Sequence, residues 1–152
     1  MNDKQTISTL NNLIETCKDG EYGFKASAEH AVNPQIKDLF LARAQDCRLA
    51  AAELQTIVMQ QGGKPEDSGT ASGTVHRGWV AVKGTLAGYT DLAMLEETER
   101  GEDAALARYR SALKEDLPQD IRSLLEAQLQ GVQRNHDQIR ALRDQHRAAE
   151  PT

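Results

Sequence analysis

Leu13-Ile14-Glu15-Thr16, followed by Gly20-Glu21, is the stretch that decides the fold, because the chain repeats it. The second half carries the corresponding residues Leu95-Glu96-Glu97-Thr98 and Gly101-Glu102. An internal repeat fixes the architecture before any residue chemistry is considered. Here the repeated unit is a pair of long helices, so the sequence predicts two helical hairpins.

Proline and glycine mark the ends of the predicted helices. Asn33-Pro34 is an N-cap followed by proline at the first helical position, and Leu117-Pro118 makes a similar stop and restart. Gly62-Gly63 ends the second helix, and residues 64–73 (KPEDSGTASG) are the only loop-like composition in the chain. The pattern predicts helices over residues 4–32, 35–61, 90–114 and 119–147, with a short extra helix near 74–87.

Apolar residues recur every three or four positions along each of the four long helices, as in the packing seams of a helical bundle. The short turns near 33 and 117 make hairpin 4–61 and hairpin 90–147 antiparallel. The crossover 62–89 is too long for a tight turn and long enough to run back along the bundle. Two antiparallel hairpins joined by one long crossover is the ferritin-like connectivity. We therefore expect an all-α, ferritin-like four-helix bundle that forms a single domain over residues 1–152.

Composition excludes several functional classes. The net charge is -5 and no basic run stands out, which argues against a nucleic-acid partner. No apolar stretch approaches the ~20 residues that a membrane-spanning helix needs, so no membrane is expected. Two cysteines cannot build a disulfide framework, which predicts a reduced, cytoplasmic compartment. Cys17 and Cys47 both fall on inner seams, and we interpret them as small buried residues rather than as a disulfide.

Polar residues interrupt the apolar seams at matched places. Glu21 and Glu102 are repeat equivalents, and each follows a glycine. A carboxylate pair at one height of a ferritin-like bundle invites a di-metal interpretation, in which each of the other two helices adds a Glu-x-x-His pair. This chain lacks those pairs: the helix 35–61 has no histidine, and Gln133-x-x-His136 has an amide in place of the carboxylate.

The favoured interpretation is a polar core without metal, formed by Glu21, Arg43, Glu102 and Gln128. In it Glu21 pairs with Arg43, and Glu102 forms a hydrogen bond with Gln128. Arg43 would place a fixed positive charge where a cation would bind, and a guanidinium cannot be deprotonated to act as a ligand. The alternative is a weak iron or manganese site formed by Glu21, Glu102 and His136.

The stretch 96–105 (EETERGEDAA), Gly20-Glu21 and His76-Arg77-Gly78-Trp79 together resemble a known family. The chain is similar, from about Leu10 to Arg143, to bacterial ferritin-like four-helix-bundle proteins known as domain of unknown function 2383. This resemblance implies the ferritin-like fold and a small stand-alone cytoplasmic protein. It implies no catalytic residues, because the family has no established reaction.

For function, we expect a non-enzymatic interaction or structural protein without a cofactor, and a homo-oligomer is one form that such bundles often take. The alternative is a ferritin- or rubrerythrin-related oxidoreductase that binds iron or manganese in its core. A third interpretation is a signalling module that uses His76 in the crossover.

Overall fold

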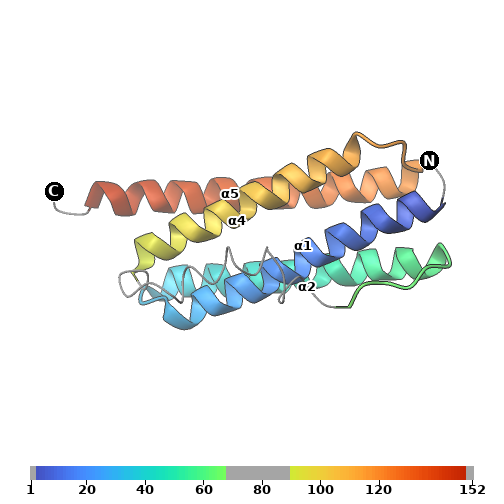
Figure 1. Ribbon diagram of the computed structural model, residues 1–152. Coiled ribbons are helices and arrows are strands. Elements are labelled where there is room, and N and C mark those ends of the chain that lie inside the picture. Colours follow the sequence, from blue (N-terminus) through green and yellow to red (C-terminus); the bar gives the residue numbers. More distant parts are fainter. Residues whose placement is uncertain (1–2, 68–89, 150–152) are drawn as a thin grey trace.

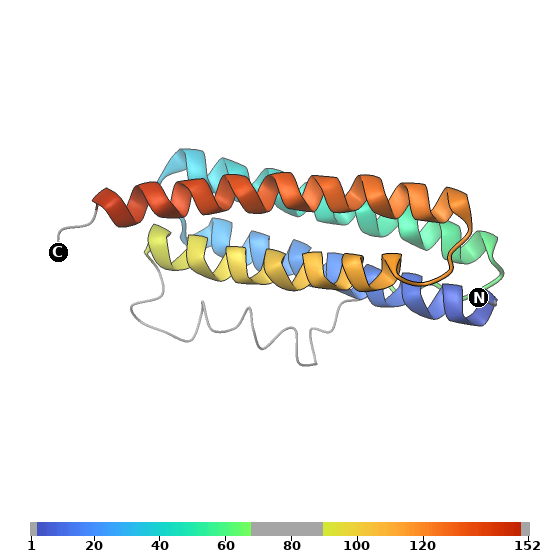
Figure 2. The same cartoon turned by 90° about the horizontal axis from the view of Figure 1, so that it is seen from above.

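The computed structural model describes residues 3–67 and 90–149, and within them the chain forms four long helices. These are α1 (Asp3–His30), α2 (Pro34–Gln60), α4 (Asp91–Leu113) and α5 (Gln119–Ala149). The predicted helix ends differ from these by at most two residues, and the short helix predicted near 74–87 lies outside the described residues. Figures 1 and 2 show α1 with α2 and α4 with α5 as two antiparallel hairpins packed into one bundle.

The turn between α1 and α2 forms as the sequence predicts. The Asn33 side chain accepts hydrogen bonds from the backbone N–H groups of Gln35 (2.8 Å) and Ile36 (3.3 Å), and Pro34 begins the helix. Asp91 at the start of α4 then accepts from the backbone N–H groups of Val32 (2.8 Å) and Asn33 (2.9 Å). This carboxylate joins the two hairpins at one end of the bundle.

At the end of α2 the chain turns at Gly62, whose φ of 82° lies in the left-handed region that glycine adopts without steric cost. The segment that follows is held to the bundle through side chains of α1 and α2. Asn11 bonds the backbone of Lys64 (3.2 Å) and Glu66 (2.8 Å), and Gln55 donates to the carbonyl of Glu66 (2.8 Å). The start of the crossover therefore returns across α1.

The core consists of two apolar clusters with a polar layer between them. The first surrounds Leu10, Leu54 and Tyr109, and the second surrounds Phe24 and Phe40. Between the clusters lie the buried polar side chains Arg43, Thr98, Glu99, Glu102 and His136. Burying charged groups is costly unless they are paired, so the partners in this layer bear on its chemistry. Within the described residues, no helix combines the length and apolar character that crossing a membrane requires.

Candidate functional site

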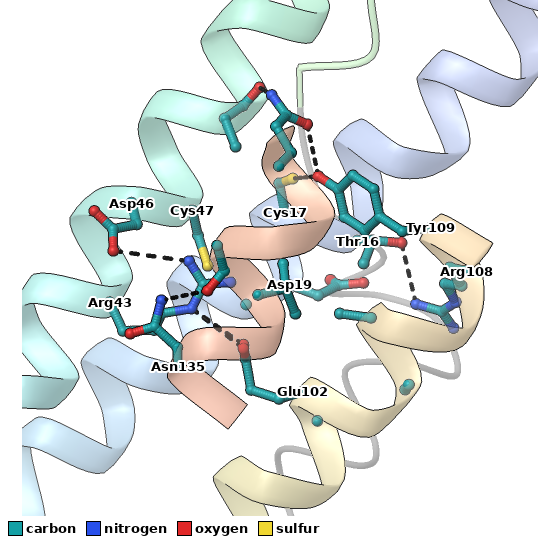
Figure 3. Close-up of a pocket in the computed structure, with 18 of the residues that line it drawn as sticks. Thr16, Cys17, Asp19, Arg43, Asp46, Cys47, Glu102, Arg108, Tyr109 and Asn135 are labelled. Carbon is teal, nitrogen blue, oxygen red and sulfur yellow. Dashed lines mark hydrogen bonds and ion pairs between the residues drawn. The ribbon is translucent and has the colours of Figure 1, made fainter. Parts of the chain in front are cut away.

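Arg43 and Glu102 form an ion pair in the middle of the bundle. The Nε of Arg43 donates to both carboxylate oxygens of Glu102, each at 3.3 Å, and the two side chains are only 7% and 3% exposed. Asp46, one turn further along α2, lies 3.9 Å from Nη1 of Arg43. Figure 3 shows the guanidinium reaching from α2 toward α4, with Asp46 on one side and Glu102 on the other.

The predicted polar core is right in placing Arg43 and Glu102 inside the bundle and wrong about the pairing. Glu21 pairs instead with Lys25 (3.0 Å) and Lys18 (3.9 Å) on its own helix. The reason is helix rotation: α1 turns Gly20 toward α2, so Glu21 lies at the side of that contact.

Gln128 also has partners other than the predicted one. Its side-chain oxygen accepts from the hydroxyl of Tyr109 at 2.8 Å, and its nitrogen donates to Glu53 at 3.3 Å and to the carbonyl of Ala50 at 3.4 Å. The predicted hydrogen bond between Glu102 and Gln128 is therefore wrong. Tyr109 lies about two turns beyond Glu102 on α4, and its hydroxyl donates the hydrogen bond to the Gln128 oxygen.

The ring of Phe24 covers the other side of the arginine. The Cζ atom of Arg43 lies 5.8 Å from the centre of the Phe24 ring, which packs at 5.9 Å and 44° against Phe40. A guanidinium above a ring face is attracted by the negative charge of that face. The guanidinium of Arg43 is thus held between the carboxylates of Glu102 and Asp46 and the ring of Phe24.

Burial sets the ionisation of Glu102. Desolvation raises the pKa of its carboxyl above the ordinary value of 4.5, while Arg43 and, more weakly, His136 act to lower it. The positive charge of Arg43 therefore reduces the cost of keeping an ionised carboxylate inside the protein.

The two cysteines are buried free thiols, as interpreted from the sequence. Burial raises the pKa of the Cys17 thiol to about 11, and it raises the pKa of Cys47 further. The sulfur of Cys17 lies 3.3 Å from the hydroxyl of Tyr109. A thiol that stays protonated is a poor nucleophile and a poor metal ligand, so neither cysteine is suited to covalent catalysis.

His136, also in the polar layer, lies among three carboxylates of its own. Its Nε2 is 2.6 Å from Asp103 and 3.7 Å from Glu99, and its Nδ1 is 3.2 Å from Asp137. Arg143 pairs with Glu99 on the same side. Here one histidine is surrounded by carboxylates that sequence reasoning did not single out.

The three residues of the predicted metal site are not grouped in this structure. His136 is close enough to Glu102 to lower the pKa of its carboxyl, whereas Glu21 forms ion pairs with Lys18 and Lys25. Over residues 3–67 and 90–149, no three histidine, cysteine, aspartate or glutamate side chains are placed together as a metal ion would require.

A cavity of about 600 Å³ opens beside the ion pair, and all four helices line it (Figure 3). Small side chains leave this space open; they are Gly20, Ala50, Gly101, Ala104, Ala105, Ala127 and Gly131. Arg43, Glu102, Cys17, Cys47 and Tyr109 also line it. The signal that could have predicted it is the spacing of Gly101 with Ala104 and Ala105, and of Ala127 with Gly131, each on one helix face.

Gly20 permits the close approach of α1 and α2 at this cavity. A Cβ atom at this position would lie 2.9 Å from the sulfur of Cys47, which is too close for a normal contact. We expect Gly20→Ala to destabilise the protein by about 1 kcal/mol, because overpacking outweighs the gain in helix propensity. In a Cys47→Ala background the same change should instead stabilise by about 0.5–1 kcal/mol. Urea denaturation of the four proteins measures both values, and equal effects in the two backgrounds would contradict the contact.

Comparison with known proteins shows first the fold class of the protein and then its family. A solved structure of a Dps1 mutant from Mycobacterium smegmatis matches with a TM-score of 0.75 and 18% identity, over 93% of this chain and 96% of that chain. At this identity the likeness shows the fold, which is that of a ferritin-like four-helix bundle and confirms the predicted fold class. The family model described as "Domain of unknown function (DUF2383)" matches residues 5–115, and the chain belongs to that family. The comparison with curated proteins gives no match.

Proposed function

We propose that this protein is a non-enzymatic ferritin-like bundle whose core holds an ion pair in place of a metal centre, and that it acts by binding. The observation that carries the proposal is the contact between Arg43 and Glu102, with both Glu102 oxygens occupied by one guanidinium. The proposal keeps the expectation of a cytoplasmic protein that self-associates.

The ion pair disfavours a cation for two reasons. Arginine remains protonated at any physiological pH, so its charge opposes a second positive charge nearby. A metal at Glu102 would also have to displace Arg43, which is 7% exposed and would be left buried without that partner. Oxygen chemistry of the ferritin kind needs bound metal, so this core favours a binding role.

Metal analysis tests this proposal directly. We expect protein purified without chelators to contain less than 0.1 equivalents of iron or manganese, and anaerobic addition of Fe(II) or Mn(II) to leave the melting temperature unchanged. On exposure to air, Fe(II) should oxidise no faster with the protein than in buffer. Elemental analysis, thermal melts and absorbance measure these three quantities.

Glu102→Gln and Glu96→Gln provide the matched comparison. Glu96 is a surface carboxylate on the same helix that pairs with Arg147. Stoichiometric metal that is lost in Glu102→Gln and retained in Glu96→Gln would overturn the proposal. It would favour the alternative, an oxidoreductase whose metal site includes Glu102 and His136 of the predicted set, without Glu21.

A further inference from the structure

The cavity beside the ion pair has the size of a small-molecule site. Its volume of about 600 Å³ lies within the range of roughly 300–1,000 Å³ that is usual for organic ligands. Leu49, which is half-exposed, lines it together with the partly buried Leu124, so the cavity reaches the surface beside α2 and α5. A ligand could therefore enter without the bundle unfolding.

Part of the wall is suited to an apolar body, while charged side chains line the rest of the cavity. Alanine, glycine, leucine and valine side chains come from facing helices, among them Ala50 on α2, Ala105 on α4, and Ala127 and Val132 on α5. Apolar surface placed against them would be removed from water, which contributes about 25 cal/mol per Å².

The polar end of the cavity offers hydrogen-bond donors. The Nε of Arg43 is used by Glu102, whereas the terminal amino groups form no hydrogen bond with any residue that the structure describes. An arginine carries five N–H donors, so these groups can bind an acceptor in the cavity. A carbonyl or amide oxygen is an acceptor that such donors can bind.

The charges around the cavity disfavour an anionic ligand. Five carboxylates line it against four arginines, so an anion gains no net attraction; they are Asp19, Asp46, Glu53, Glu97 and Glu102, and Arg43, Arg100, Arg108 and Arg134. Arg43 already faces two carboxylates, Glu102 at 3.3 Å and Asp46 at 3.9 Å. A further anion at the guanidinium would meet the buried carboxylate of Glu102, whose side chain is 3% exposed, and like charges at a poorly solvated group repel strongly. The protonated thiols of Cys17 and Cys47 add no reactive group, so binding is non-covalent.

We propose that this cavity binds one small, uncharged organic molecule with an apolar body and a carbonyl or amide acceptor directed at Arg43. The inference rests on the proposed function, because a metal at Glu102 would occupy the same place. The proposed function is a binding role without a named ligand, and this inference names the class of ligand.

Fluorescence titration with Nile red, an uncharged aromatic dye with a carbonyl group, tests the proposal. We expect saturable binding of one dye per chain, and binding at least tenfold weaker for the anionic dye 1-anilinonaphthalene-8-sulfonate. Ala105→Phe and Ala127→Phe fill the cavity from α4 and α5 and should each weaken Nile red binding at least tenfold. Ala107→Phe places the same ring on an exposed part of α4 outside the cavity and should bind like the wild type.

Three outcomes would overturn the inference: unsaturable binding, equal binding by Ala105→Phe and Ala107→Phe, or anionic dye binding as tightly as Nile red in a manner that Ala105→Phe abolishes. Circular dichroism must show that each variant is folded. If Ala105→Phe does not fold, Ala127→Phe takes its place in these comparisons. The metal analysis separates the two proposals. Metal-free protein that fails to bind the dye contradicts only the cavity, whereas stoichiometric metal contradicts the ion-pair core.

Discussion

Arg43→Met should destabilise the protein by about 3 kcal/mol near pH 7. Methionine keeps much of the volume of the arginine stem but leaves Glu102, whose side chain is 3% exposed, without its charged partner. Removing one member of a buried ion pair typically costs about 3–5 kcal/mol, mostly through the uncompensated charge. Denaturation in urea, monitored by circular dichroism, measures the loss.

The double variant Arg43→Met/Glu102→Met is the control for this assignment. Replacing both charges by apolar groups of similar size is often neutral or stabilising, so most of the lost stability should return. If the double variant were as unstable as Arg43→Met alone, the loss would reflect packing of the arginine stem rather than the stranded charge.

The pH dependence provides a second check on the same pair. The pKa of Glu102 in the folded protein is raised above its ordinary 4.5, so the folded state holds this proton more tightly than the unfolded state. The free energy of unfolding therefore increases as the pH falls from the pKa of Glu102 in the folded protein toward its pKa in the unfolded chain. Arg43 lowers the folded pKa, so its removal raises that pKa further. The difference between wild type and Arg43→Met should shrink from about pH 7 to about pH 5.

The helices and their pairing could be predicted from sequence because they depend on local signals. The periodic apolar residues, the Asn33-Pro34 cap and Gly62 each act within a few residues of their own position. The repeat then fixes two hairpins. The family model and the Dps1 structure confirm the resulting class.

The partners within the core could not be predicted in the same way. Neighbouring residues on a helix point about 100° apart. Because α1 faces α2 through Gly20 and not through Glu21, the carboxylate that pairs with Arg43 is not the predicted one. Sequence spacing places residues at a height in the bundle and leaves this rotation open within a residue or two. Glu102 on α4 therefore occupies the place that was assigned to Glu21.

The cavity depends on still finer geometry. Its volume results from the separation of four helices and from small side chains that meet across them. The glycine and alanine spacings on α4 and α5 are visible in the sequence, yet the same residues would equally allow helices to pack closely. Only the structure distinguishes an open space from a close contact.

Phe24→Ala should destabilise the protein by about 4 kcal/mol. The ring is fully buried, packs against Phe40 and covers the guanidinium of Arg43, so its removal leaves a cavity next to a buried charge. Large-to-small changes of this type cost about 3–5 kcal/mol. Phe24→Leu should cost only about 1.5 kcal/mol, since most of the volume is retained. Urea denaturation measures both changes.

A double-mutant cycle then separates the ring's packing from its contact with the arginine. With Phe24→Leu and Arg43→Met, we expect a coupling of about 1–2 kcal/mol, because the cation and the aromatic face are both shielded from water. Phe40→Leu is the matched comparison, because that ring packs against Phe24 without an observed contact to the guanidinium among the described residues. Coupling to Arg43 that is as large for Phe40 as for Phe24 would mean that the energy reflects shared core packing, and the ring would have no particular part in holding Arg43 at the cavity.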